Sequence, residues 1–210
     1  MMKIKERQKY LKKLGLYKGK IDGIEGSGTK KGYEYINIIF LNVSNDNYTS
    51  KTDSKLKTAY NSYKKSKYMT SADWKLFPNF KESDFKCKKK YCDGFNGRKN
   101  KCYMKLIMFA QYIRNYYDKP VYISSGVRCK KRNAQVGGVK TSKHLVFKAM
   151  DFKVGNLKAN EVFKVVKKMI TSFLKVKNPT KQMFKDLISK ITIDKDKKVK
   201  IYFKFNLIGE

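Results

Sequence analysis

The chain has 210 residues, with 50 Lys and Arg against 17 Asp and Glu and a formal net charge of +33. Hydrophobic residues make up 41% and aromatic residues 14%, which is enough for a buried core, so disorder is excluded in spite of the charge. No run of about 18 apolar residues is present, so we expect no membrane span. The N-terminal residues contain no apolar signal region, so we expect synthesis in the cytoplasm without a signal peptide. The length allows one domain or two small ones.

The positive charge comes almost entirely from lysine, since only five of the 50 basic residues are Arg. Arg is the preferred reader of bases and phosphates because its guanidinium is a planar fork. A lysine-rich chain is typical of a solvated surface or of a diffuse attraction to polyanions, such as nucleic acid or the teichoic acids of a cell wall. No nucleic-acid-binding motif accompanies the charge, so nucleic acid is the less favoured partner.

Residues 1–64 predict a small helical module. Apolar residues recur at helical spacing over 4–14, 33–40 and 56–63, which predicts three helices. Gly15 is placed to end the first helix. A glycine-rich loop follows, and Thr29 is placed to cap the second helix. Residues 65–78 are predicted to be a linker, in which Trp74 and Phe77 are available to pack onto either neighbouring domain.

Residues 79–210 show a mixed pattern. Amphipathic helices are predicted around 106–113 and 162–173, and strands at 121–123 and 149–154. Alternating residues at 191–193 and 199–205, around a turn at 194–197, predict a hairpin. Because helices and strands mix without a regular βαβ rhythm, the sequence favours an α+β fold with an antiparallel sheet flanked by helices.

The loop between the first two predicted helices carries a distinctive set of residues. They are Gln8, Leu11, Leu14, Gly15, Tyr17, Gly19, Ile21, Asp22, Gly23, Gly26, Gly28 and Thr29. This set resembles the peptidoglycan-binding-domain-1 family, a three-helix module, over residues 3–40, and the resemblance fades toward residue 64. It implies that a cell-wall polymer docks near the loop. The same residues also have a purely structural interpretation, in which they build the loop.

A second set of motifs lies at 124–129 (SSGVRC), 136–138 (VGG), 142–144 (SKH) and 149–152 (AMDF). Over residues 79–155 the chain resembles the zinc D-alanyl-D-alanine carboxypeptidase and L-alanyl-D-glutamate endopeptidase family of peptidoglycan peptidases. The resemblance implies that His144 and Asp151 bind zinc, which activates a water for attack on an amide. It also implies that Arg128 and Ser142 hold the substrate or stabilise the developing oxyanion.

The chain departs from this family at two places. A third zinc ligand, a His on a late strand, is usual in the family, but His144 is the only His here and Leu207 stands where the third ligand is expected. The nearby Asp of that segment is replaced by Gly209. The glycine that usually follows the ligand His by three residues is Phe147. Candidates to complete the metal shell are Asp194, Asp196, Glu210 and Cys129.

The four cysteines, Cys87, Cys92, Cys102 and Cys129, do not have a zinc-finger spacing. Because the chain is expected to be made in a reducing compartment, buried free thiols are the simplest expectation. A structural metal site, or one or two disulfides formed after release from the cell, are the alternatives.

Two functions are compatible with these observations. The first is an endolysin-type, zinc-dependent hydrolase of the peptidoglycan stem peptide, with residues 1–64 binding the wall, 65–78 as the linker and 79–210 as the peptidase domain. The second is a degenerate, inactive peptidase-like protein for wall attachment or virion assembly, which the missing third His favours. The expected partners are peptidoglycan and anionic wall polymers, together with other virion proteins for a particle component. The expected site of action is the bacterial cell wall.

Overall fold

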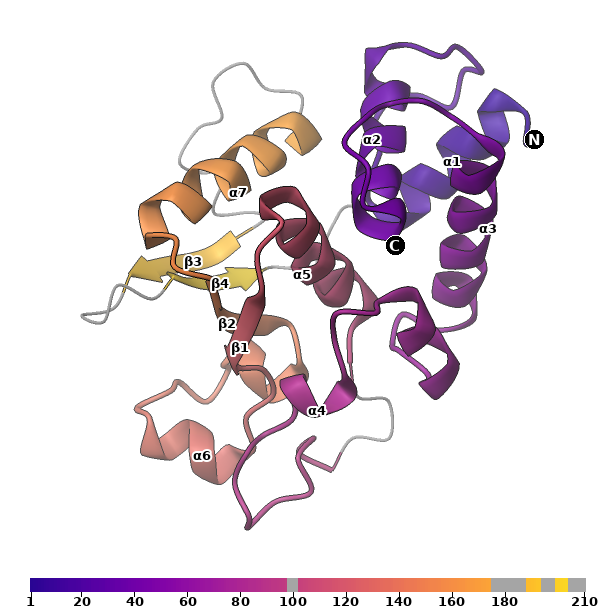
Figure 1. Ribbon diagram of the computed structural model, residues 1–210. Helices are drawn as coiled ribbons and strands as arrows, with labels where there is room; N and C mark the ends of the chain where they lie inside the picture. Colours follow the sequence, from indigo (N-terminus) through magenta and orange to yellow (C-terminus); the bar gives the residue numbers. More distant parts are fainter. Residues whose placement is uncertain (98–101, 175–187, 194–198, 204–210) are drawn as a thin grey trace.

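The computed structural model of the chain describes residues 1–97, 102–174, 188–193 and 199–203 (Figure 1). Helices and strands mix in it, which confirms the expected α+β class. The elements are α1 (Ile4–Leu14), α2 (Ser27–Leu41), α3 (Ser50–Lys65), the 3₁₀ helix η1 (Ser71–Leu76), α4 (Glu82–Phe85), α5 (Met104–Tyr117), β1 (Val121–Ser125), α6 (Lys130–Gln135), the 3₁₀ helix η2 (Lys143–Val146), β2 (Ala149–Val154), α7 (Ala159–Leu174), β3 (Ile188–Ile193) and β4 (Val199–Phe203).

The N-terminal helices begin and end close to the residues that the sequence predicts, with one exception. Gly15 ends α1 with a left-handed backbone at φ 81°, which confirms the predicted stop. The prediction that Thr29 caps the second helix is wrong, because α2 already begins at Ser27 with Gly26 as its N-cap. Thr29 is buried inside the first turn of α2, and its hydroxyl accepts a hydrogen bond from Gln8 instead.

Gln8 organises the loop between α1 and α2. Its fully buried Nε2 donates to Asp22 Oδ1 at 2.8 Å and to the Ile24 carbonyl at 3.0 Å, and its Oε1 accepts from the Gly23 backbone N–H at 2.9 Å. Gly23 has a φ of 86°, a conformation that favours glycine. Several residues of the loop motif therefore serve to build the loop itself.

The sheet contains four strands in the order β1-β2-β4-β3, and each neighbouring pair is antiparallel. The pairing of β3 with β4 confirms the predicted hairpin, while its turn at 194–198 and Phe205 lie outside the described residues. A bulge in β1, between Ile123 and Ser125, sets Ser125 opposite Asp151 of β2. Nearly all of β2 is buried, so the alternation of residue types in its sequence does not mark one buried face and one solvent-exposed face.

Helix α5 lies between the N-terminal helices and the sheet (Figure 1). The Tyr35 ring of α2 packs 5.5 Å from Tyr112 of α5, and the Phe109 ring packs 6.3 Å from Phe152 of β2. The prediction of an amphipathic helix is wrong here, because every residue from 106 to 113 is buried. The N-terminal helices cover one side of α5 and the sheet covers the other, so its middle turns have no solvent-exposed face.

The segment 65–78 is packed against both of its neighbours. Phe77 is fully buried with its ring 5.6 Å from Phe40 of α2, and the Trp74 ring lies 6.0 Å from Phe85. The Met69 N–H donates to the Cys102 carbonyl at 2.6 Å. One continuous hydrophobic core therefore runs from the N-terminal helices to the sheet.

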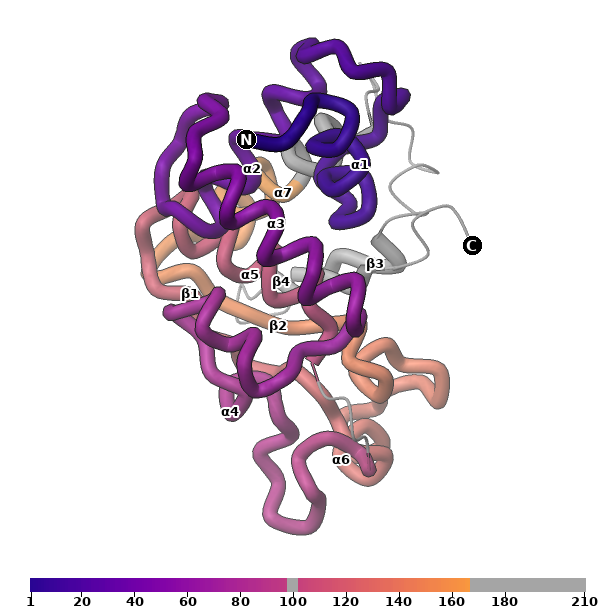
Figure 2. Tube along the Cα trace, turned by 90° about the vertical axis from the view of Figure 1, so that its right-hand side faces the viewer, coloured from indigo at the N-terminus to yellow at the C-terminus, as the bar shows by residue number. Residues whose placement is uncertain are grey.

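The N-terminal helices and α6 lie at opposite ends of the molecule. Figure 2 shows α1 to α3 toward one end and α6, with the loop at 86–97, at the other. The sheet and α5 lie between them.

Among the described residues, no helix combines the length and the apolar character that crossing a membrane requires.

Candidate metal centre

The sheet places Asp151 on the face that is turned away from α5. Successive residues of a strand point to opposite faces, and Phe152 packs on Phe109 of α5. Asp151 therefore points to the other face, where η2 brings His144. Both side chains are buried, with His144 fully buried and Asp151 3% exposed.

His144 is held by the turn that follows β1. Its Nδ1 lies 2.6 Å from the Gly126 carbonyl oxygen. A carbonyl only accepts, so Nδ1 carries a proton and donates, which leaves Nε2 as the ring nitrogen that faces Asp151. The distance between His144 Nε2 and Asp151 Oδ1 is 3.4 Å. Gly126 is required here, because a Cβ at this position would lie 2.2 Å from the Phe85 carbonyl oxygen.

These two donor atoms fit a zinc ion. With Zn–N and Zn–O bonds of about 2.0–2.2 Å and a tetrahedral angle, two ligand atoms are separated by about 3.4 Å. Asp151 Oδ1 also accepts no hydrogen bond from the described residues, although it is buried. The bond from His144 Nδ1 to a backbone carbonyl is the usual outer support of a zinc-bound imidazole. The structure thus brings together the two residues that the sequence predicts as metal ligands.

Arg128 joins the same cluster. Its Nη2 donates to Asp151 Oδ2 at 2.6 Å and its Nε donates to Ser125 Oγ at 3.0 Å. Its backbone N–H also donates to the His144 carbonyl at 3.1 Å. The ion pair is shielded, with the two side chains 13% and 5% exposed. Arg128 therefore fixes the carboxylate so that Oδ1, rather than Oδ2, faces the imidazole.

Ser142 lies two residues before His144 and is the N-cap of η2. Its carbonyl accepts from the Leu145 N–H at 3.0 Å, but its hydroxyl makes no capping hydrogen bond. The side chain is half-buried. Ser142 is therefore close to the centre along the chain, and its predicted contact with substrate stays a prediction.

Phe147, where the resemblance implies a glycine, ends η2 in the left-handed region with φ 53° and ψ 39°. Its side chain is fully buried, and its ring meets the Phe85 ring edge-on at 5.8 Å. The backbone conformation that glycine would supply freely is therefore kept by a phenylalanine, at the expense of strain that its packing offsets.

No third protein ligand accompanies His144 and Asp151 among the residues that the structure describes. In that part of the chain, one group of three or more His, Cys, Asp or Glu side chains lies close enough to share a metal. It contains neither His144 nor Asp151. Cys129, a candidate for the shell, belongs to that other group. The remaining candidates, Asp194, Asp196 and Glu210, and the substituted positions Leu207 and Gly209, lie outside the described residues.

The other group consists of Cys87, Cys92 and Cys129, whose sulfur atoms all lie within 4.8 Å of one another. All four cysteines of the chain are free thiols in the structure, and three of them are buried. Sequence spacing misses the group because Cys129 is remote from the other two. The turn at Gly126 packs closely against the backbone of Phe85, and the Val127 N–H donates to the Phe85 carbonyl at 2.7 Å. This contact brings Cys129 next to the segment that carries Cys87 and Cys92.

Residues 78–183, half of the chain, match the family model described as Peptidase M15. The match contains His144, Asp151, Arg128 and Ser142, as well as the three clustered cysteines. No match is found among curated proteins.

Proposed function

Because the chain belongs to the peptidase M15 family, whose members are zinc-dependent, we propose that it is a zinc peptidase that cuts the stem peptide of peptidoglycan. The observation that carries this proposal is the buried pair of donor atoms, His144 Nε2 and Asp151 Oδ1, set 3.4 Å apart. Such a pair has the separation and the donor chemistry of two zinc ligands. The third ligand would come from the part of the chain outside the described residues.

The residues of the centre have separable roles in this proposal. His144 and Asp151 hold the metal, and the Gly126 carbonyl keeps the proton of His144 on Nδ1. A bound zinc ion supplies a Lewis acid and lowers the pKa of a coordinated water to about 7. Arg128 orients Asp151 and, with five N–H donors of which these two side-chain bonds use two, has donors left for a substrate carboxylate or an oxyanion. Ser142 is proposed to contact the substrate.

An endolysin-type division of labour is the second part of the proposal. Residues 1–64 hold the wall and residues 79–210 cut it, joined by residues 65–78. Because Gln8, Asp22 and Gly23 are used in building the loop, we propose that a wall polymer meets its exposed side chains, Ile24 (69% exposed) and Ile21 (43%).

The charge supports the choice of partners. A net charge of +33, carried mostly by lysine, favours anionic wall polymers over a specific nucleic-acid site. We propose that the protein is made in the cytoplasm without a signal peptide and acts at the bacterial cell wall, and that a virion-associated form has other virion proteins as partners.

A second candidate function is an inactive member of the family that serves in wall attachment or virion assembly. One observation favours it: the chain has a single His, and no third ligand joins the pair within the described residues. Catalytic zinc sites normally have three protein ligands and a water.

Release of new amino termini from purified sacculi, with added zinc, tests both candidates. The His144→Ala variant is compared with Lys140→Ala, which changes an exposed residue of the same segment. Release by the wild type and Lys140→Ala that falls to background in His144→Ala supports the peptidase. No release, with the protein still pelleting with the sacculi, supports the inactive wall-binding protein, provided that a known wall hydrolase cuts the same sacculi. A result with no release of amino termini and no pelleting with the sacculi would contradict both candidates.

A further inference from the structure

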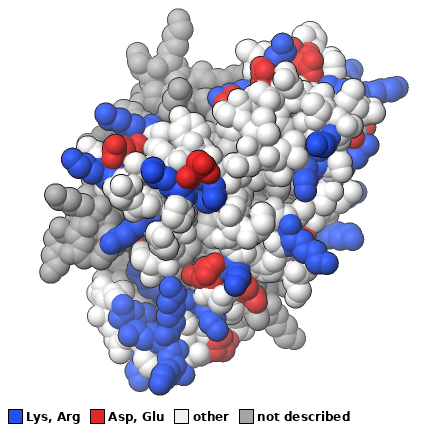
Figure 3. All heavy atoms as spheres, viewed as in Figure 1, with Lys and Arg blue, Asp and Glu red and all other residues white. Residues whose placement is uncertain are grey.

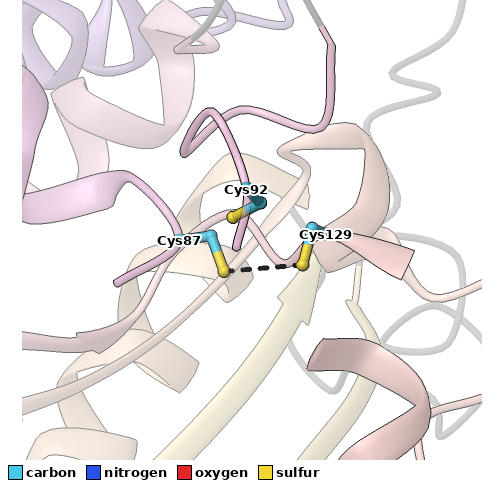
Figure 4. Close-up of side chains that lie close together, drawn as sticks. All are labelled: Cys87, Cys92 and Cys129. Carbon is cyan, nitrogen blue, oxygen red and sulfur yellow. Dashed lines mark hydrogen bonds between the residues drawn. The ribbon is translucent and has the colours of Figure 1, made fainter. Parts of the chain in front are cut away.

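Three cysteine side chains converge at the end of the molecule opposite the N-terminal helices. Cys87 and Cys92 come from the loop at 86–97, and Cys129 is the N-cap of α6, where its sulfur accepts from the Arg132 N–H at 3.4 Å. Figure 4 shows the three side chains turned toward a common point. The Cys87 and Cys129 sulfurs are 3.9 Å apart, and Cys92 lies within 4.8 Å of both.

These distances suit a metal ion better than a covalent bond. With Zn–S bonds of about 2.3 Å and a tetrahedral angle, two ligand sulfurs are separated by about 3.8 Å, whereas a disulfide requires about 2.05 Å. Cys87 and Cys129 already have the first separation. Thiolates are soft ligands that select zinc over calcium or magnesium.

We propose that Cys87, Cys92 and Cys129 bind a second zinc ion, distinct from the one held by His144 and Asp151. Three thiolates supply three ligands of a tetrahedral site, and a water occupies the fourth position. This site rests on the sulfur positions alone and does not depend on peptidase activity.

The electrostatic surroundings favour this arrangement. Three thiolates and one Zn²⁺ carry a net charge of −1, and lysines flank the three cysteines along the chain. The exposed ones are Lys86, Lys88, Lys89, Lys90, Lys130 and Lys131. In Figure 3 basic side chains gather at the lower left, over the part of the molecule where α6 lies. This positive field offsets the excess negative charge of the metal–thiolate unit.

The protonation behaviour of the thiols agrees with the geometry. Burial opposes ionisation of Cys87, but hydrogen bonds from the backbone of Cys129 and Lys89 lower its pKa below the ordinary value. Burial, together with the neighbouring thiols of Cys87 and Cys129, raises the pKa of Cys92 to about 11. Without a cation Cys92 therefore resists ionising beside Cys87. Metal binding removes this conflict, because a coordinated thiol loses its proton.

The proposed zinc has a structural task. The loop at 86–97 forms no helix or strand, and its ties include the hydrogen bond from the Cys87 N–H to the Gly94 carbonyl at 2.7 Å. The sulfur of Cys129 would join this loop to the turn at 126–129, next to Arg128. A metal at this point therefore clamps the loop to the segment that positions Arg128.

The test uses the full-length protein, purified under reducing conditions, stripped of metal and reloaded with zinc alone. We expect X-ray absorption of the wild type to show sulfur neighbours at about 2.3 Å from zinc. Cys92→Ser changes the least buried of the three cysteines and should lose these sulfur neighbours together with one equivalent of zinc. His144→Ala should keep the sulfur-bound zinc, which separates this site from the proposed peptidase centre.

Cys102→Ala is the matched control, since Cys102 is buried but lies outside the cluster. It should retain the sulfur-bound zinc. If Cys92→Ser does not fold, alkylation of the wild type decides: zinc should protect Cys87, Cys92 and Cys129 from labelling and release them when it is chelated. Zinc with only nitrogen and oxygen neighbours, no protection of these thiols, or a Cys87–Cys129 disulfide that persists in reductant would overturn the proposal.

Discussion

Replacing Phe147 with Gly and with Ala separates backbone strain from side-chain packing next to the proposed centre. Phe147 is fully buried and has a φ of 53°, where most L-residues are strained. Both variants lose the buried ring and its contact with Phe85, which costs about 3–5 kcal/mol of unfolding free energy. Only Gly also removes the strain, so we expect Phe147→Gly to be the less destabilised of the two.

The size of this difference follows from two opposing effects. A left-handed backbone costs a residue with a Cβ about 1–2 kcal/mol, and glycine escapes this. Glycine in turn loses about 0.5–1 kcal/mol more conformational entropy on folding than alanine. We therefore expect Phe147→Gly to be more stable than Phe147→Ala by about 0.5–1 kcal/mol.

Phe77 is the control, because it is also fully buried but has a φ of −128°. No left-handed strain exists there, so Phe77→Gly should be less stable than Phe77→Ala by about 0.5–1 kcal/mol. The order of the two variants is thus reversed between the positions. Urea unfolding followed by circular dichroism measures it. With an m-value of about 2–3 kcal/mol/M, a difference of about 1 kcal/mol shifts the midpoint by about 0.4 M.

The reasoning is refuted if Ala is the more stable replacement at both positions. That result would mean that residue 147 does not hold a left-handed backbone in solution, and that a phenylalanine at this position carries no strain. A change of m-value in one variant would signal an altered denatured state, and the comparison would then use variants with matching m-values.

Three further substitutions test other parts of the fold. Gly126→Ala places a Cβ 2.2 Å from the Phe85 backbone oxygen, so it should displace the carbonyl that holds the His144 imidazole and reduce retention of zinc at the proposed His144–Asp151 site; full retention of the zinc that has no sulfur neighbours would contradict that geometry. Gln8→Leu breaks three hydrogen bonds of 2.8–3.0 Å in the first loop and should lower the unfolding free energy by about 3 kcal/mol, against less than about 1 kcal/mol if the loop holds without it. Burial raises the pKa of Asp53, but hydrogen bonds from the Met2 N–H, Lys57 and Tyr48 outweigh it and lower the pKa to about 2. Its folded pKa is below the ordinary 3.8, so its contribution is complete above pH 4 and is lost as the pH falls toward 2; Asp53→Asn should lose less stability over that interval, and an identical acid profile would contradict this.

The parts of the fold that sequence predicts are those that local patterns determine. The first helix follows from a three-to-four spacing and ends at a glycine, and the last hairpin follows from alternation around a polar turn. Thr29 shows where such patterns fail. A threonine before a helix resembles a cap, but here the buried amide of Gln8, 21 residues away, engages its hydroxyl and the helix starts earlier.

The candidate site was predictable to the extent that family motifs carry it. His144, Asp151 and Arg128 occupy motif positions, and the structure brings their side chains together. The thiol group could not be derived from spacing, because it depends on the sheet and on the close approach of one loop to Gly126. Metal sites built from residues remote in the chain require the tertiary structure, whatever the local pattern.

The two proposed zinc sites are joined by four consecutive residues, and this sets how they influence each other. The Gly126 carbonyl holds His144, Arg128 holds Asp151, and Cys129 closes the thiol group. The turn between them is anchored by the hydrogen bond from the Val127 N–H. Because this anchor does not involve sulfur, loss of the thiol-bound zinc should loosen the centre without dismantling it. The proposed peptidase centre would gain from such a clamp, since ligands that are held rigidly lose less entropy when they bind a metal than mobile ones.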